Sequence, residues 1–517
     1  MLIKLCYNCP MVAKITTATL IGLEAYKIEV EVDVVNSLPQ IAIIGLGDTA
    51  IAEAKERLRL AIKNSSFDFP QTKVVINLAP ADIKKEGTSY DLAMAVGILA
   101  KENIVKNIPS DTAFLGELSL DSSLRPISGI LPIVCALGDL GIKKVILPYQ
   151  NLKEASFVEN IESLGVKNLN ELVAFLNGEG RLQSLKQNVD DFLSIGNNFE
   201  IDFKHVKGQK SAKYALEIAA AGAHNVLMCG VPGSGKTMLS KAFVSILPPL
   251  EKSEAIELTK IYSASGLLDY DKPLISSRPF RSPHHSASAV GIIGGGSKVR
   301  PGEITLAHRG VLFLDEMVEF PRQVLEVLRQ PLEDGVVTIS RASQSVRFPA
   351  KFILIGAMNP CPCGYLGDTK KHCTCSDYQI RRYRSKLSGP LLDRIDLQID
   401  VPRLSEDELL NIKEDGEDSL SIRKRVVRAR NIQLERYKQD GILTNSELSA
   451  KLVKKYCKID DESKSMLKFA ISKFDLSARS YERLLKLSRT IADLNCRENI
   501  ELNDVAQALQ FRGLKIY

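Results

Sequence analysis

Residues 230–237, with the sequence Gly-Val-Pro-Gly-Ser-Gly-Lys-Thr, limit the possible folds of this chain more than any other stretch. A short apolar run over 225–229 precedes them, and residues 238–246 have helical composition and an apolar face. Strand, glycine-rich loop and helix form the context of a phosphate-binding P-loop. The glycines let backbone N–H groups close around a polyphosphate, and the helix N-terminus adds partial positive charge. We therefore predict that the chain binds ATP.

Two further elements complete the predicted site. Lys236 is expected to reach the β- and γ-phosphates, and Thr237 to hold Mg²⁺ through its hydroxyl. The apolar run over 311–314 ends in Asp315, expected to hold Mg²⁺ directly or through water, and in Glu316, expected to polarise the attacking water. A solvated turn is the alternative for both acids. The predicted nucleotide-binding residues are Gly230, Val231, Pro232, Gly233, Ser234, Gly235, Lys236, Thr237, Met238 and Asp315.

Composition limits the class of protein. A chain of 517 residues has room for roughly two to four domains, and 45% hydrophobic with 25% charged residues is ordinary for a globular protein. The net charge of +6 permits a nucleic-acid partner without requiring one. No apolar run approaches the roughly 20 residues that span a bilayer, and the first residues make a poor signal peptide. We expect a cytoplasmic protein without a membrane partner.

Changes in composition and hydrophobic pattern along the chain predict its domains. Residues 1–10 are expected to be an extension, 11–177 a mixed α/β domain, 178–200 a polar linker, 201–404 the core that holds the P-loop, and 405–517 a helical lid. Within the first domain, alternating or apolar runs predict strands over 27–34, 73–78 and 143–148, and helical spacing predicts a helix over 50–63.

Four of the 10 cysteines lie within fifteen residues, as Cys361, Cys363, Cys373 and Cys375. Four thiolates at this spacing can surround tetrahedral Zn²⁺ at about 2.3 Å each. We predict a structural zinc in the loop over 359–376, in a reducing compartment. Free thiols are the alternative, and His372 is a possible substitute ligand. Four protein ligands leave no open position, so this metal is not expected to be catalytic.

The first domain resembles the proteolytic domain of Lon. Residues 84–89, 116–120, 126–130 and 141–148 follow the order of Lon segments, with Ser89 in the place of the nucleophile. The resemblance implies an α+β fold like ribosomal S5 domain 2. Leu131 stands where Lon has its activating lysine, and a serine without an adjacent base is a weak nucleophile. We therefore expect the fold without peptidase activity, and Ser89 as a turn or helix-cap residue.

The second domain resembles the AAA+ ATPases. The apolar run ending at Asn359 is similar to their sensor strand, whose asparagine helps to place the water. Segment 388–396 resembles the arginine-finger segment, with Arg394, and 476–483 resembles the second sensor, with Arg479 facing phosphate. The resemblance implies that Arg394 reaches the γ-phosphate of a neighbouring subunit, and head-to-tail contacts of this kind close into rings. The predicted catalytic residues are Glu316, Asn359, Arg394 and Arg479.

Two segments narrow this class. Residues 277–300 and 335–347 resemble the helix-2 insert and the pre-sensor hairpin of magnesium-chelatase and minichromosome-maintenance ATPases, and 335–347 has hairpin composition. In the helicase members such hairpins line the pore of the ring and touch DNA. The predicted DNA contacts are Lys298, Arg300, Arg341 and Arg347. Solvated surface charge is the alternative for each.

Other chemistry-bearing residues carry weaker predictions. His284 and His285 are adjacent, and for them packing and hydrogen bonding under the insert is favoured over a metal or catalytic role. The basic runs over 381–386 and 421–430 are either solvated helix faces or phosphate contacts.

Taken together, the chain is similar to the ComM/YifB family of magnesium-chelatase-like bacterial ATPases. Residues 207–209, 278–281, 283–285 and 359–365 carry the likeness, while Gly47 and His205 depart from it. The resemblance implies a homo-oligomer, as a hexameric ring, that couples Mg-ATP hydrolysis to translocation on branched or double-stranded DNA. It implies a branch-migration helicase in natural transformation or recombination. The alternatives are a chelatase-type motor subunit acting on a protein partner and an ATP-dependent protease.

Overall fold

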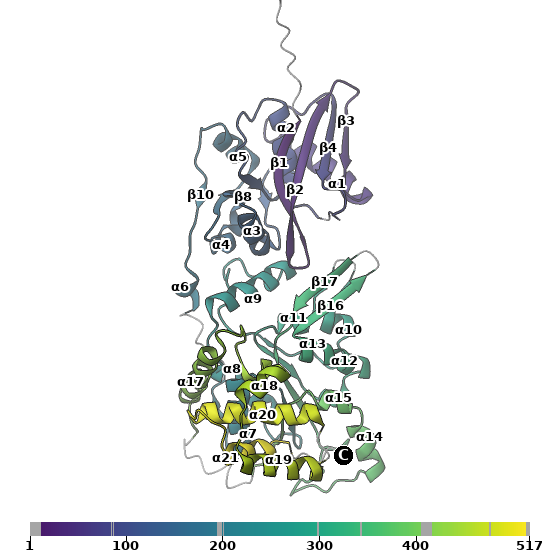
Figure 1. Cartoon of the computed structure of the whole chain (residues 1–517). Coiled ribbons are helices and arrows are strands. Elements are labelled where there is room, and N and C mark those ends of the chain that lie inside the picture. Colours follow the sequence, from purple (N-terminus) through teal and green to yellow (C-terminus); the bar gives the residue numbers. More distant parts are fainter. Residues whose placement is uncertain are drawn as a thin grey trace, which may run out of the picture. The chain divides into compact units, whose positions relative to one another are not determined.

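The computed structural model describes residues 12–512 apart from 84, 86, 194–198, 200, 297–298, 342–343, 405–415 and 475–476. The chain forms two compact units (Figure 1). Unit 1 comprises Met1–Ser194 with Ala255–Ile275, and unit 2 comprises Ile195–Glu254 with Ser276–Tyr517. The expected extension over 1–10 and the side chain of Lys298 lie outside the described residues.

Unit 1 is built on an eight-stranded mixed sheet in the order β10-β9-β8-β5-β1-β2-β4-β3. The strand β2 shows why these segments are extended: Ile28, Val30 and Val32 are buried while the residues between them are more exposed, as in a strand with one face toward solvent. The predictions of strands over 27–34, 73–78 and 143–148 and of a helix over 50–63 are confirmed as β2, β4, β8 and α1.

The strands of unit 1 are β1 Ala13–Ile21, β2 Glu24–Val35, β3 Gln40–Ile44, β4 Lys73–Ala79, β5 Thr112–Phe114, β6 Glu117–Leu118, β7 Leu124–Arg125, β8 Lys144–Pro148, β9 Glu162–Val166 and β10 Gln183–Ser184. Its helices are α1 Asp48–Asn64, α2 Asp91–Lys101, α3 Ile130–Asp139, α4 Leu152–Ala155, α5 Leu169–Leu176 and α6 Val189–Leu193. The strand β10, which pairs with β9, and the helix α6 both lie within the stretch predicted to be a linker.

The helix α2 is buried along most of its length and packs on β1 and β2. Its Gly97 makes the closest approach: a Cβ atom added there would lie 2.4 Å from Cγ2 of Val32 and 3.4 Å from Cγ1 of Ile15. Both neighbours are buried β-branched side chains, which have little freedom to move aside. Glycine is therefore required by the spacing between helix and sheet.

We predict that Gly97→Ala lowers the free energy of unfolding by about 1–2 kcal/mol, although alanine favours a helix, because overpacking a rigid core outweighs the gain in helix propensity. The midpoint of urea unfolding measures the change. Gly180→Ala is the matched control, since its new Cβ would meet its nearest atom at 3.7 Å. Equal midpoints for the two variants would contradict the proposed close packing.

Residues 255–275 belong to unit 1, although the sequence assigns all of 201–404 to one core. They include most of α9 (Lys252–Ser265), whose Ser263 accepts a hydrogen bond from the N–H of Gly129 at 3.0 Å. The hydroxyl of Ser263 donates to the buried carboxylate of Glu154, which also accepts the N–H of Leu131 at 2.9 Å. The residue before α3 thus bonds directly to a segment far along the chain, and Glu154 links the first turn of α3 to the same serine.

Unit 2 is organised by a five-stranded parallel sheet in the order β12-β15-β18-β11-β19. Its inner strands are short apolar runs, as expected of strands covered on both faces. Alternate side chains enter two different cores. Val226, Met228 and Phe313 pack with helices α7, α8, α17 and α20, and Leu227 and Leu314 pack in the second core.

The strands of unit 2 are β11 Val226–Cys229, β12 Phe280–Arg281, β13 Gly294–Gly295, β14 Arg300–Pro301, β15 Val311–Leu314, β16 Val336–Arg341, β17 Gln344–Pro349, β18 Ile353–Met358 and β19 Leu397–Asp400. Its helices are α7 Lys210–Gly222, α8 Lys236–Ile246, α10 Ala289–Ile293, α11 Glu303–Leu306, α12 Arg322–Val327, α13 Arg329–Asp334, α14 Asp377–Arg384, α15 Gly389–Leu392, α17 Ser419–Tyr437, α18 Ala450–Tyr456, α19 Asp461–Phe474, α20 Ala478–Leu494 and α21 Leu502–Gln510.

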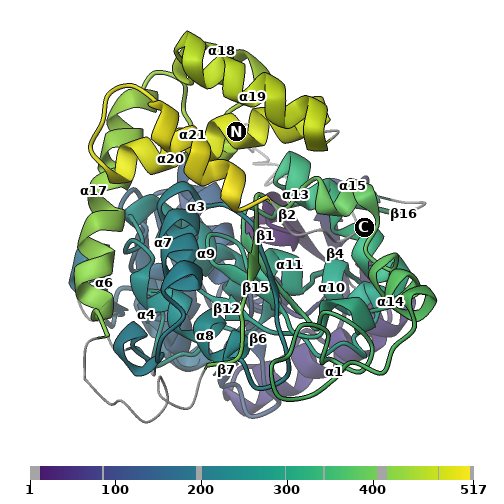
Figure 2. The same ribbon diagram turned by 90° about the horizontal axis from the view of Figure 1, so that it is seen from below.

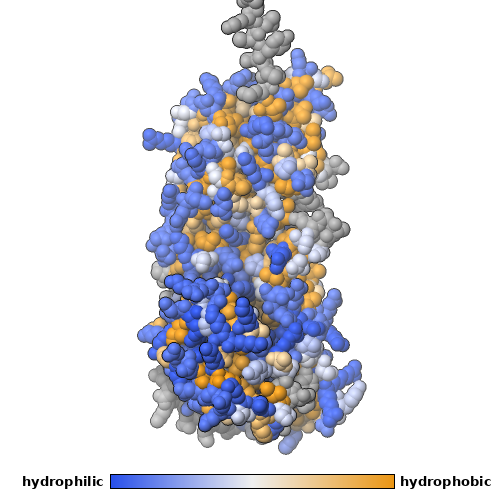
Figure 3. Space-filling model, in the orientation of Figure 1, coloured by the Kyte–Doolittle hydropathy of each residue, from blue (hydrophilic) through white to orange (hydrophobic). Residues whose placement is uncertain are grey.

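Two predictions about unit 2 are confirmed. The expected hairpin is β16 paired antiparallel with β17, from Val336 opposite Pro349 to Arg341 opposite Gln344. The C-terminal part is mostly helical over its described residues, and α17–α21 gather into one bundle (Figure 2). On the face drawn in Figure 3, hydrophilic residues of unit 2 surround small hydrophobic areas. Among the helices that the structure describes, none is both long enough and apolar enough to cross a membrane.

Candidate active site

The predicted P-loop joins the end of β11 at Cys229 to the start of α8 at Lys236. Gly233 and Gly235 adopt φ values of 77° and 95°, which other residues rarely take, and a Cβ on either would meet nothing within 4 Å. At Gly230, by contrast, a Cβ would lie 2.2 Å from the carbonyl oxygen of Val401. The loop therefore has one side closed by protein and one side open, as a phosphate cradle needs.

Lys236 lies at the centre of this loop and is only 9% exposed. Its Nζ donates to the carbonyls of Gly230 at 2.6 Å and Val231 at 3.1 Å, and to Oδ1 of Asn359 at 3.3 Å. Burial lowers the pKa of Lys236. The lysine predicted to bind phosphate and the asparagine predicted to place the water are thus in direct contact.

The carboxylate of Asp315 meets the P-loop helix. Thr237 donates its hydroxyl to Oδ2 of Asp315 at 2.9 Å. The contact follows from topology, because β11, β18 and β15 are parallel neighbours and their carboxyl ends share one edge of the sheet. A threonine hydroxyl and a carboxylate are oxygen donors of the kind that Mg²⁺ takes. These two residues fit the predicted role of holding Mg²⁺.

Glu316 has an unusual backbone conformation, with φ 49° and ψ 45°. Such left-handed geometry costs a non-glycine residue about 1–3 kcal/mol and is concentrated at functional sites. The carboxylate of Glu316 lies 3.6 Å from Nδ1 of His285, whose ring packs 4.1 Å from that of His284. Sequence reasoning noticed the histidine pair but not its contact with Glu316, because the two segments meet only once β12 is placed beside β15.

Gln209 supports the P-loop from outside and was missed by sequence reasoning. Its Nε2 donates to the carbonyls of Pro402 at 2.7 Å and Ser234 at 3.3 Å. Its backbone is also left-handed, with φ 54°. Gln209 belongs to the segment 207–209 that carries the family resemblance, and a glutamine just before a helix was the available signal.

The two predicted arginines do not lie at this edge of the sheet. Arg394 precedes β19, and its carbonyl accepts Nδ2 of Asn225, the residue before β11. The P-loop follows the other end of β11, which pairs in parallel with β19. Four strand residues span about 13 Å, so Arg394 and the P-loop of one chain lie at opposite edges.

Arg394 and Arg479 meet at a single carboxylate instead. The side chain of Arg394 is 7% exposed, and its Nη1 donates to the carbonyl of Pro390 at 2.6 Å while its Nη2 pairs with Glu333. Arg479 donates to Oε1 of the same Glu333 at 3.0 Å. No sequence signal marked Glu333, which is one of two acids at the end of a short helix.

The four predicted zinc ligands are brought together. Their sulfur atoms all lie within 4.8 Å of one another, with Cys361 3.4 Å from Cys363 and 3.6 Å from Cys373. Sulfurs at the corners of a zinc tetrahedron are about 3.8 Å apart, so the cluster fits zinc. Hydrogen bonds from the backbone N–H groups of Tyr365 and Thr374 lower the pKa of Cys363 to about 6, and the thiolate is the form that binds metal. His372, the alternative ligand, is exposed and outside this group.

We predict that Cys363→Ser removes tightly bound zinc, from about one ion per chain to a small fraction, because a hydroxyl is a poor zinc ligand. Metal analysis of protein purified without chelator measures the change. Cys496→Ser is the control, since that exposed cysteine lies in another part of the fold. Zinc retained by Cys363→Ser, or absent from the unaltered protein, would contradict the assignment.

The predicted DNA contacts are partly described. Arg300 in β14 and Arg347 in β17 are exposed. Arg341 is the last residue of β16, and Lys298 lies outside the described residues. The insert and the hairpin lie side by side: a Cβ atom added to Gly294 of β13, which pairs with β14, would lie 3.1 Å from Cδ1 of Ile339 in β16. The structure thus places two exposed cations on adjacent elements.

The parallel sheet, the P-loop after β11 and the acids after β15 define a P-loop ATPase of the AAA+ class. The family model described as magnesium chelatase, subunit ChlI, matches residues 202–409. Models of subunit ChlI of Mg-chelatase and of the ChlI C-terminal region match residues 30–151 and 416–512.

The chain belongs to the ComM/YifB family of magnesium-chelatase-like ATPases, as two relatives of similar length show. It is 40% identical to competence protein ComM of Haemophilus influenzae, over 95% of this chain and 96% of the relative. It is 38% identical to YifB of Salmonella typhimurium, over 97% of both chains. A magnesium-chelatase 67 kDa subunit of Heliobacterium mobile is 27% identical over 31% of this chain and 28% of its own length.

Proposed function

We propose that the chain is an ATP hydrolase whose active sites form between neighbouring copies in a ring. One copy supplies Lys236, Thr237, Asp315, Glu316 and Asn359, and the next supplies Arg394 and Arg479. The observation that carries the proposal is the position of the two groups at opposite edges of one parallel sheet. An arginine at the amino edge cannot serve the nucleotide of its own chain, but it can serve a neighbour stacked head to tail.

Each residue has a distinct task in the proposed reaction. Lys236 binds the β- and γ-phosphates, and Asn359, bonded to Lys236, orients the water. Glu316 polarises that water as it attacks the γ-phosphorus and the bond to the β-phosphate oxygen breaks, giving ADP and phosphate. Arg394 stabilises the charge that develops on the transferred group. Mg²⁺ held by Thr237 and Asp315 would supply counter-charge to the phosphate oxygens.

Mixing two inactive variants tests whether the site is shared. We predict that Glu316→Gln and Arg394→Ala each abolish turnover, and that a 1:1 mixture regains roughly a quarter of unaltered turnover. In random rings roughly one interface in four joins an intact Glu316 to an intact Arg394. Phosphate release measures the rate. No recovery in a mixture proved to contain mixed rings would contradict a shared site, as would full turnover by an isolated monomer.

We further propose that hydrolysis drives translocation on DNA, as a branch-migration helicase in natural transformation or recombination. Residues 272–302 and 335–350 contain no aspartate or glutamate, yet carry Lys298, Arg300, Arg341 and Arg347. An insert and an adjacent hairpin that carry no acidic side chain are suited to binding a phosphate backbone. The Haemophilus relative is named a competence protein, which agrees with a DNA substrate.

We predict that the double change Arg300→Ala with Arg347→Ala weakens binding to branched DNA about tenfold or more at low salt, and lowers the slope of log affinity against log salt by about 2. Fluorescence anisotropy at several salt concentrations measures both. Lys454→Ala is the control, as an exposed cation on α18. Unaltered protein that fails to bind branched DNA, or equal effects of control and double change, would contradict this role.

The family match supports one other function, that of a motor subunit acting on a protein partner in metal insertion. The regions shared with magnesium-chelatase subunits cover 31% of this chain. That function would need a separate catalytic subunit, and its ATP turnover would respond to the partner and be indifferent to DNA. The acid-free hairpins favour DNA. Both functions use the same ATP site.

For unit 1 we propose a Lon-like fold without peptidase activity. Ser89 lies in the turn before α2, where its carbonyl accepts the N–H of Gly116 at 3.1 Å. Leu131, in the position of Lon's lysine, is fully buried, and its backbone N–H is bonded to Glu154. An apolar side chain there cannot take the proton of a serine hydroxyl.

A further inference from the structure

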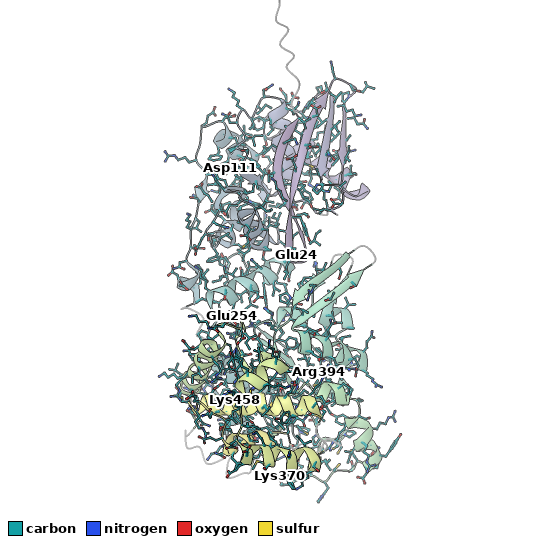
Figure 4. All side chains as sticks on the ribbon, in the orientation of Figure 1. Glu24, Asp111, Glu254, Lys370, Arg394 and Lys458 are labelled. Atoms are coloured by element: carbon teal, nitrogen blue, oxygen red, sulfur yellow. The ribbon has the colours of Figure 1, made fainter. Side chains whose placement is uncertain are left out.

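The carboxylate of Glu333 forms ion pairs with Arg394 and Arg479, the two arginines that act on a neighbouring subunit's nucleotide in the proposed function. Glu333 lies in the last turn of α13 and borders a cavity of about 550 Å³ that Arg394 also lines. Its side chain is 45% exposed, whereas that of Arg394, which is labelled in Figure 4, is 7% exposed. Arg479, on the first turn of α20, is 58% exposed and reaches the same carboxylate.

The charges at this point favour a stable contact. Burial acts to raise the pKa of Glu333, but the hydrogen bond and charge of Arg394, with the charges of Arg479 and Arg483, outweigh it and hold the pKa below its usual value. Glu333 is therefore ionised at neutral pH. The two Nη groups of Arg394 are occupied within its own subunit, by Glu333 and by the carbonyl of Pro390. A phosphate of the neighbouring subunit must compete with Glu333 for this guanidinium.

Glu333 is also tied to the hairpin expected to meet nucleic acid. The N–H of Gly335 donates to the carbonyl of Pro331 in α13 at 2.9 Å, and the carbonyl of Gly335 accepts the N–H of Ala350 at 2.8 Å. These bonds join the end of α13 to the base of both β16 and β17. These backbone contacts are the shortest route by which a displacement of the hairpin would reach Glu333.

The backbone of Arg394, by contrast, is held by residues at the edge of the parallel sheet. The carbonyl of Arg394 accepts Nδ2 of Asn225 at 3.1 Å and Nη1 of Arg483 at 2.8 Å. Arg483 in turn pairs with the buried Asp396. A displacement of the hairpin would thus move Glu333, while these contacts would hold the backbone of Arg394 to Asn225 and Arg483.

We propose that Glu333 is a positioning residue that holds Arg394 and Arg479 within their own subunit until the β16–β17 hairpin engages nucleic acid, and so makes ATP turnover depend on DNA. The inference rests on the proposed function, because it needs a shared ATP site and a DNA-binding hairpin. Glu333 does not touch the nucleotide in this scheme. It acts by competing for the arginines that do.

The test is Glu333→Gln, which keeps the shape of the side chain and removes its charge. We expect turnover without DNA to rise about tenfold, and stimulation by branched DNA to fall toward onefold, because the arginines lose their competing anion. Glu333→Asp, which keeps the charge, should lie closer to the unaltered protein. Glu326→Gln is the matched control, since Glu326 lines the same cavity and pairs with Arg329, and it should match the unaltered protein.

The thermal midpoint and the conservative variant separate positioning from a structural role. The thermal midpoint of Glu333→Gln should match that of Glu326→Gln, and Glu333→Asp should retain stimulation by DNA. Unchanged or reduced turnover in Glu333→Gln, or unchanged stimulation by DNA, would overturn the inference. Absence of turnover in the unaltered protein would overturn the proposed function itself, whereas normal turnover with an indifferent Glu333→Gln overturns the inference alone.

Discussion

The parallel alignment of the five strands in unit 2 is the constraint from which the candidate site follows. Because β11, β15 and β18 run in one direction, the residues that end them must share one edge of the sheet. That edge receives the P-loop, the acids at 315 and 316, and Asn359. The contact of Thr237 with Asp315, between segments far apart in sequence, needs no other cause. The short apolar strands hold this alignment by filling a core on each face.

The same alignment gives the opposite edge a separate chemistry. The residues that precede the strands, such as Asn225 and Arg394, meet there with the end of α13 and the start of α20. Cations and one central carboxylate collect at this edge, while the phosphate cradle is at the other. In the proposed function, a single chain therefore carries two complementary halves of a reaction site, kept apart by the length of a strand. Complementary halves of this kind favour association through unlike surfaces.

Sequence patterns were sufficient where one segment determines its own structure. The P-loop between β11 and α8, the β16–β17 hairpin and the four clustered cysteines could all be predicted, because spacing along the chain sets their geometry. Glu333, Gln209 and the contact of His285 with Glu316 could not, since each depends on which strands lie side by side. The pairing of β10 with β9 could not be predicted either, because both residues of β10 are exposed and polar and so give no hydrophobic pattern. Function beyond the ATP site came from resemblance alone.

The left-handed backbone of Glu316 lowers the stability of the fold at the residue to which the proposed function assigns water activation. Glycine, and to a lesser degree asparagine, would adopt this conformation with less strain than glutamate does. Either would give a more stable protein, but one without the carboxylate that the proposed function assigns to water activation. Selection for stability alone would therefore not retain glutamate at this position, which agrees with the proposed catalytic role.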